Sequence, residues 1–147
     1  MRPSFLFAGT RVAARWQCAC ASDNRQPMTS PVPTYQIYGR RKGKPLRRYH
    51  ESLMDGLLPE LAVDLAHPLG GTAERRWLEI GFGGGEHLAH QAALHPDVSL
   101  IGAEPFLNGV AKLLAEIEAR KLTNVRVHHG DARPLLDRLP DAAFERI

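Results

Sequence analysis

The chain has 147 residues, a length that suits one domain with a single hydrophobic core and leaves no room for a second full domain. Apolar residues make up 44% of the sequence and charged residues 24%, which is ordinary for a globular protein. No apolar run approaches the roughly 18 residues of a membrane-spanning helix, so we expect a soluble protein with no membrane partner.

Charge is distributed unevenly along the chain. Residues 1–48 contain ten Lys or Arg and one acidic residue, whereas residues 49–147 contain nine Lys or Arg and fifteen acidic residues. Their net charges are therefore +9 and −6. A basic segment attached to a mildly acidic body indicates binding to a polyanion, although charge alone does not identify it.

Residues 1–33 show neither a helical nor a strand period and contain four prolines, so we expect a disordered extension. Two alternatives stay open: an organellar targeting segment, since the beginning is Arg-rich and acid-poor, and a natural start at Met28. Cys18 and Cys20 lie here without a second pair for a zinc site or a disulfide framework. We interpret them as free thiols of an intracellular, cytoplasmic protein.

A basic segment follows at residues 34–50. Six of the nine residues from 40 to 48 are Lys or Arg, next to glycines that keep the backbone adaptable and tyrosines able to stack. We interpret it as a phosphate-binding arm, and a solvated basic linker or a localisation signal is the alternative. The candidate phosphate-binding residues are Arg40, Arg41, Lys42 and Lys44. If about five phosphates were neutralised, log K would fall with log salt at a slope of roughly −4 to −5.

The remaining residues, 51–147, alternate between helix and strand patterns. A leucine at every fourth position gives one apolar face to a helix, or to two short helices broken near Pro59. These leucines are Leu53, Leu57, Leu61 and Leu65. We expect strands at residues 77–82, 98–103 and 124–128, a fourth strand from Phe144, and helices at 86–94, 107–120 and 134–139. Such alternation predicts an α/β fold with a parallel sheet covered on both faces, which we expect to stop inside the fourth strand.

A glycine-rich turn, Glu79-x-Gly81-x-Gly83-x-Gly85, joins the first of these strands to the next helix. Such a turn lets a ligand approach the backbone and the free N–H groups of a starting helix. The dinucleotide fingerprint needs a small residue where this chain has Glu86. An acid at the strand end would repel a pyrophosphate but suits the ammonium and sulfonium groups of S-adenosylmethionine, which we therefore expect as the cofactor.

Two further acids follow the next two strands, at the edge where an open α/β sheet binds its ligand. Glu104 is placed to accept hydrogen bonds from both ribose hydroxyls, and Asp131 from the adenine amino group. A solvated loop charge or a helix cap is the alternative for any one of these carboxylates. Three of them on successive strands beside the glycine turn favour a cofactor site.

No metal site is expected. His87 and His90 lie beside Glu86, but the zinc motif His-Glu-x-x-His needs a different order and spacing. His128 and His129 follow a strand end, where ordinary exposure explains them better than a role in the pocket.

Four segments carry a resemblance to a known family. They are residues 38–47 (YGRRKGKPLR), 78–88 (LEIGFGGGEHL), 101–110 (IGAEPFLNGV) and 124–132 (NVRVHHGDA). Together they resemble the bacterial tRNA (guanine-N7)-methyltransferases, over about residues 36–147. The glycine turn alone would indicate only a methyltransferase, whereas the segment Glu-Pro-Phe-x-Asn-Gly-Val and the basic arm narrow the resemblance to this family.

The resemblance implies a Rossmann-like, S-adenosylmethionine-dependent methyltransferase fold and transfer of methyl to N7 of a guanosine in the tRNA variable loop. It implies a monomer whose basic arm contacts tRNA. The implied cofactor contacts come from Glu79, Gly81, Gly83, Glu104 and Asp131.

The family's pattern continues into a Pro-Asp-Pro-Trp segment, whose Asp is taken as catalytic, and into later substrate-binding residues. These would follow Ile147, so we assign no catalytic residue here and expect a fragment without turnover of its own. One alternative is a catalytically silent remnant that binds RNA or a partner. Another is a methyltransferase acting on protein or on a small molecule.

Overall fold

The computed structural model describes residues 43–70 and 73–147, all within one compact unit, Thr34–Ile147. The predictions for residues 1–33 lie outside the described residues, as do those for Arg40, Arg41 and Lys42.

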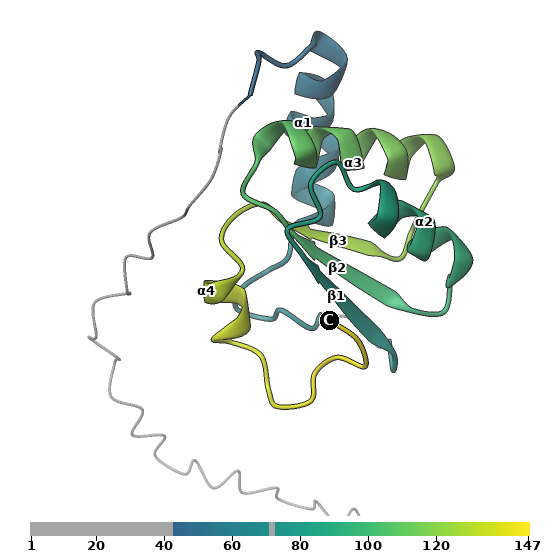
Figure 1. Cartoon of the computed structure of the whole chain (residues 1–147), viewed down its shortest axis with the longest axis vertical. Coiled ribbons are helices and arrows are strands. Elements are labelled where there is room, and N and C mark those ends of the chain that lie inside the picture. The colour runs from purple at the N-terminus through teal and green to yellow at the C-terminus, as the bar shows by residue number, and fades with distance from the viewer. Residues whose placement is uncertain (1–42, 71–72) are drawn as a thin grey trace, which may run out of the picture. The chain divides into compact units, whose positions relative to one another are not determined.

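Three parallel strands form the sheet, in the order β1-β2-β3 (Figure 1). They are β1 (Arg76–Ile80), β2 (Ser99–Ala103) and β3 (Val125–His128), each within two residues of its predicted bounds. Ile80 pairs with Ala103 and Ala103 pairs with His128, so the carboxyl ends of the three strands are level. Residues that follow the strands therefore meet at one edge of the sheet, called the carboxyl edge below.

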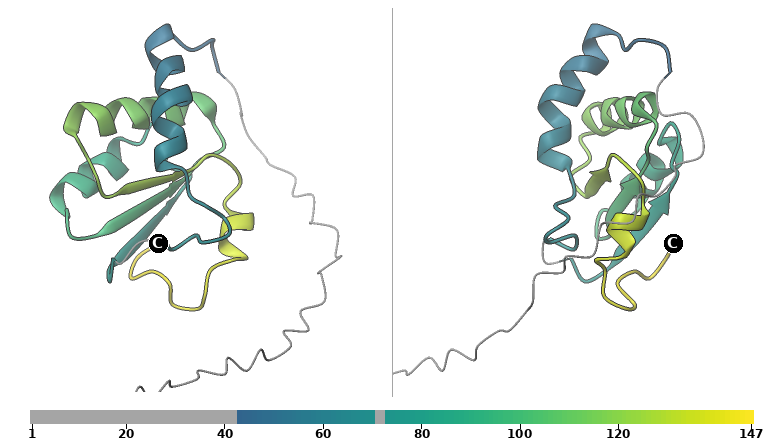
Figure 2. Two further views of the ribbon diagram at one scale, coloured as in Figure 1. Left: turned by 180° about the vertical axis from the view of Figure 1, so that it is seen from behind. Right: turned by 90° about the vertical axis from the view of Figure 1, so that its left-hand side faces the viewer.

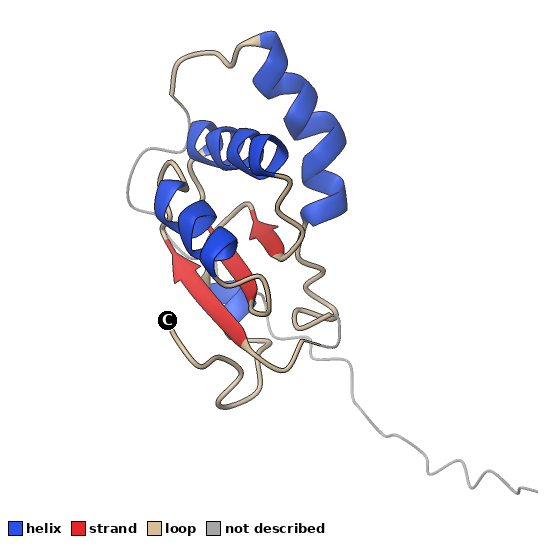
Figure 3. Cartoon of the chain, turned by 90° about the vertical axis from the view of Figure 1, so that its right-hand side faces the viewer, coloured by secondary structure: helices blue, strands red, loops and turns tan. Residues whose placement is uncertain are grey.

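Three helices lie on the same side of the sheet, as Figure 3 shows. They are α1 (Arg48–Leu61), α2 (Glu86–Leu94) and α3 (Leu107–Arg120). The last two have the predicted bounds because their apolar period, and the glycine or proline near their ends, mark them in the sequence. Their buried side chains form the main core with the sheet, where Leu88, Val110, Leu113 and Leu114 are at most 1% exposed.

The other face of the sheet carries a smaller apolar cluster. Helix α4 (Arg133–Leu136) lies on this side, away from the three long helices (Figure 2). The cluster includes Leu78 and Ile101 from the strands and Leu135 from α4. Val63, Leu65 and other half-buried side chains pack against it. The expected α/β architecture, with a parallel sheet covered on both faces, is confirmed.

Helix α1 differs from its prediction in its bounds. It begins at Arg48, inside the segment assigned to the basic arm, and ends two residues after Pro59. It is one continuous helix, which is the first of the two predicted alternatives. Pro59 has no backbone N–H, so one hydrogen bond of the last turn is missing. Leu65 lies beyond the helix and packs on the opposite face of the sheet from Leu53, so the predicted leucine stripe stops at Leu61.

The predicted fourth strand is present only as a short pairing beside β1. The N–H of Leu78 donates to the carbonyl of Arg146 and the N–H of Glu145 to the carbonyl of Arg76, both at 3.0 Å. Trp77 and Arg146 form one isolated parallel bridge, too short to count as a strand.

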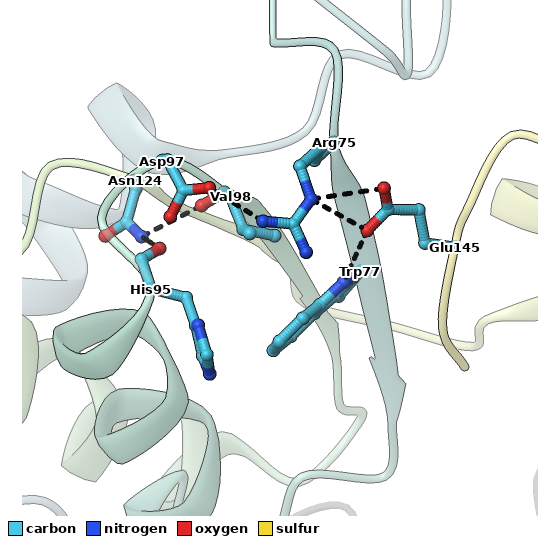
Figure 4. A network of polar contacts seen from close by, with 7 residues as sticks. All are labelled: Arg75, Trp77, His95, Asp97, Val98, Asn124 and Glu145. Carbon is cyan, nitrogen blue, oxygen red and sulfur yellow. Dashed lines mark hydrogen bonds and ion pairs between the residues drawn. The ribbon is translucent and has the colours of Figure 1, made fainter.

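Polar side chains fix the opposite, amino edge of the sheet (Figure 4). The amide nitrogen of Asn124 lies 2.9–3.1 Å from three carbonyl oxygens, those of Ala92, His95 and Val98. Nearby, the guanidinium of Arg75 pairs with Asp97 and Glu145. This network joins the end of α2 to the starts of β1 and β2. It lies at the edge of the sheet opposite the carboxyl edge.

Candidate functional site

The glycine turn between β1 and α2 has a left-handed backbone at three positions. Gly81, Gly83 and Gly85 have φ angles of 73°, 59° and 79°, which strain any residue with a side chain. A Cβ added to Gly81 or Gly83 would meet no atom within 4 Å, so open space adjoins both. A Cβ on Gly85 would lie 2.6 Å from the Cβ of Leu113. The first two glycines thus leave room for a ligand, and the third allows α2 to pack on α3.

Glu104 lies next to this turn and is only 7% exposed. Its Oε2 accepts a hydrogen bond from the N–H of Gly83 at 2.8 Å, and its Oε1 accepts one from the N–H of Phe106 at 2.9 Å. The carboxylate therefore braces the turn against the loop between β2 and α3. Each oxygen keeps a further lone pair, so the carboxylate retains capacity to accept hydroxyl groups of a ligand.

Glu79, near the end of β1, contacts the first turn of α2. Its Oε2 lies 2.9 Å from Nδ1 of His87. The carboxylate is 26% exposed and the imidazole 70% exposed. Glu79 thus presents negative charge beside the glycine turn, with a histidine that sequence reasoning considered only as a metal ligand.

Asp131 follows β3 and is held by the start of α4. Its Oδ1 accepts from the backbone N–H of Arg133 at 2.9 Å, and both oxygens accept from the guanidinium of the same residue. These hydrogen bonds lower the pKa of Asp131. Those from the Arg133 side chain have the larger effect, and the one from its backbone has the smaller. The carboxylate is therefore ionised at neutral pH, and a ligand there would share it with Arg133.

The three acidic side chains lie along the carboxyl edge because backbone bonds hold the strand ends together. The N–H of Gly81 donates to the carbonyl of Ala103 at 2.7 Å, and the N–H of Glu104 to the carbonyl of His128 at 3.1 Å. Sequence reasoning placed the three acids correctly at successive strand ends. It missed the contacts to Phe106 and Arg133, for which the sequence carries no distinct signal.

Of the four predicted phosphate-binding residues, the structure describes Lys44. Lys44 is exposed, and its backbone carbonyl accepts a hydrogen bond from Nδ2 of Asn108 at 2.8 Å. Asn108 lies in the first turn of α3, so the end of the basic arm joins the body near the carboxyl edge.

Residues 73–147 match the model of a protein family described as "Putative methyltransferase". The chain belongs to this methyltransferase family. Its curated relatives include the tRNA (guanine-N(7)-)-methyltransferase of Erythrobacter litoralis, 48% identical over 124 residues that make up 80% of this chain and 52% of the relative. The enzyme of the same name from Caulobacter sp. strain K31 is 49% identical over 127 residues, 82% of this chain and 56% of the relative. That of Rhizobium meliloti is 47% identical over 122 residues, 78% of this chain and 53% of the relative.

The chain spans about half the length of the curated relatives it matches. These matches confirm the family resemblance inferred from the four sequence segments.

A cavity of about 270 Å³ opens between the outer edge of β1, helix α2 and residues Arg146 and Ile147. Its lining is mostly apolar and includes Glu79, His87 and Gln91. The cavity shares Glu79 with the predicted cofactor site but touches neither Gly81, Gly83, Glu104 nor Asp131, so the two overlap only at that carboxylate.

Within residues 43–70 and 73–147, no helix is long and apolar enough to cross a membrane. The same residues contain no group of three or more His, Cys, Asp or Glu that could hold a metal ion.

Proposed function

We propose that this chain forms the cofactor-binding part of a tRNA (guanine-N7)-methyltransferase, with the Rossmann-like arrangement of S-adenosylmethionine-dependent enzymes. The observation that carries the proposal is the near-half identity to enzymes of that name over about 80% of this chain, together with a family match over residues 73–147, which include the glycine turn and its acids. S-adenosylmethionine would supply an electrophilic methyl group. The protein's residues would bind the cofactor and the tRNA and orient them for the transfer.

The carboxyl edge fits this cofactor by its shape and by its charge. Gly81 and Gly83 allow close approach of a ligand to the backbone, since a Cβ at either position would point into open space. Glu79 offers negative charge to the ammonium group. Glu104 would accept from the ribose hydroxyls, and Asp131 from the adenine amino group.

The basic arm would bind the tRNA backbone. Arg40, Arg41, Lys42 and Lys44 are the proposed phosphate contacts, and their charges predict binding that weakens steeply with salt. The backbone carbonyl of Lys44 is bound by Asn108 at the start of α3. This contact supports an arm that joins the body at the same edge as the cofactor site.

The reaction requires little proton transfer. N7 of guanine is already an unprotonated nucleophile, so the enzyme must chiefly align it with the methyl group. A nearby carboxylate would stabilise the positive charge that develops on the purine. We assign that role to no residue of this chain.

Isothermal titration of the full chain with S-adenosylmethionine, and with tRNA at about 50 and 200 mM salt, tests the proposal. We expect saturable binding of both, with tRNA affinity falling at the higher salt. Salt-sensitive RNA binding without cofactor binding would instead identify an RNA-binding remnant. Cofactor binding without RNA binding would point to a protein or small-molecule substrate.

A further inference from the structure

The side-chain amide of Asn108 binds the backbone of two adjacent residues that are far away in the sequence. The N–H of Gly43 donates to Oδ1 at 2.7 Å, and Nδ2 donates to the carbonyl of Lys44 at 2.8 Å. The donor and acceptor are 65 and 64 residues from Asn108 in sequence. The amide thus pairs with the backbone as a neighbouring peptide group would, using both of its ends. We call this contact the Asn108 clamp.

The clamp requires glycine at position 43. A Cβ there would lie 2.7 Å from Oδ1 of Asn108 and 3.1 Å from Cζ of Phe106, closer than such atoms approach without displacement. The backbone of the arm therefore lies directly against the side chains of Asn108 and Phe106, and a Cβ at position 43 would displace the amide, the ring or the arm.

The start of α3 is in turn fixed to the glycine turn. Glu104 binds the N–H groups of both Phe106 and Gly83. A Cβ on Gly109, the residue after Asn108, would lie only 2.0 Å from the carbonyl oxygen of Gly83. Two independent contacts therefore join the start of α3, which carries Asn108, to the turn.

A second contact orients the helix that follows the arm. The hydroxyl of Tyr49, in the first turn of α1, donates to Oε2 of Glu118 on α3 at 2.6 Å. The backbone from Gly43 to Tyr49 is thus attached to α3 at both ends. Three exposed cationic residues lie between or at these attachments, namely Lys44, Arg47 and Arg48.

We propose that Asn108 is a positioning residue for RNA binding, which fixes the junction of the basic arm beside the cofactor turn. Its RNA-binding aspect rests on the proposed function. Because the amide orders backbone that would otherwise sample many directions, RNA binding need not supply that ordering. The clamp adds no charge, so it changes affinity without changing how many phosphates are neutralised.

Four single variants of the full chain, and the double variant of Asn108→Ala with Gly43→Ala, test this proposal. Asn108→Ala removes the clamp, and Gly43→Ala displaces it from the other side. Lys44→Ala removes a charge but keeps the clamp, which uses only the backbone of that residue. Asn124→Ala is the matched control, because it removes an asparagine amide that binds backbone at the opposite edge of the sheet. Melting curves first establish a temperature at which all variants are folded.

The first readout concerns the clamp alone. We expect faster hydrogen exchange of the Gly43 amide in Asn108→Ala, followed by nuclear magnetic resonance, and no change in Asn124→Ala. Equal exchange in the unsubstituted chain and Asn108→Ala would overturn the clamp, whether or not the protein binds RNA.

The second readout is tRNA affinity as a function of salt. We expect Asn108→Ala and Gly43→Ala each to weaken binding about three- to tenfold with an unchanged log–log slope, and the double variant to be no weaker than either. Lys44→Ala should instead reduce the slope by about 0.9. Unchanged affinity in Asn108→Ala, or an equal loss in Asn124→Ala, would overturn the positioning role. Absence of tRNA binding by the unsubstituted chain would overturn the proposed function itself.

Discussion

We expect Glu104→Gln to destabilise the fold strongly, although the substitution preserves the size of the side chain. The carboxylate accepts from two backbone N–H groups, those of Gly83 and Phe106, at a site that is 7% exposed. A glutamine amide keeps one acceptor oxygen and directs its NH2 group at the other N–H. Leaving a buried donor unpaired costs about 1–3 kcal/mol, and exchanging a charged acceptor for a neutral one costs about 1 kcal/mol more.

We therefore expect the free energy of unfolding to fall by about 2–4 kcal/mol, a large part of the roughly 5–15 kcal/mol typical of domains. Urea denaturation followed by Trp77 fluorescence, in a Trp16→Phe background, measures this change. Glu116→Gln is the matched control, because that carboxylate pairs with Arg120 on the surface of α3. It should change the free energy by no more than about 0.5 kcal/mol.

Equal effects of the two substitutions would refute the reasoning. Such a result would mean that the two backbone hydrogen bonds of Glu104 do not brace the glycine turn against the start of α3.

Three other predictions concern the turn, the α4 contact and the amino edge. Gly85→Ala should destabilise the chain more than Gly81→Ala in thermal melts, because both force a side chain into left-handed backbone but only the first also meets a leucine of α3; equal melting temperatures would contradict this. Arg133→Ala should raise the pKa of Asp131 toward its ordinary value, as measured by titration of the carboxyl carbon. Because the pKa is depressed in the folded chain, the contact with Arg133 stabilises the fold at pH values above the ordinary Asp pKa. That stabilisation is lost as the pH falls through the depressed pKa. Asn124→Ala should lower the free energy of unfolding by about 1–3 kcal/mol in urea, and no loss would show that the three carbonyls need no such partner.

The sequence predicted the sheet and two of its helices because local signals determine them. Helix α2 begins directly after a glycine and ends just before Pro96, and its bounds agree with the prediction. The apolar period of α3 likewise fixed that helix and its buried face. The glycine turn and the order of the three acids also followed from spacing, since parallel strands bring their carboxyl ends to one edge.

Contacts between distant residues could not be predicted in the same way. Helix α1 begins within a basic segment that has no capping residue, and tertiary contacts such as Tyr49 with Glu118 hold it on α3. The clamp depends on the distance between Gly43 and Asn108 in the folded chain. The pairing of Asp131 with Arg133 is close in sequence, but nothing in the spacing distinguishes it from two solvated charges.

The central claim is that the glycine turn at the carboxyl edge binds S-adenosylmethionine. Titration of the isotopically labelled chain with this compound, followed by amide chemical shifts, tests it most directly. We expect the amides of Gly81 and Gly83 to shift and saturate together, while those lining the cavity outside β1, such as Gln91 and Arg146, stay unchanged. Shifts confined to that cavity, or no saturable shift at the turn, would contradict the account.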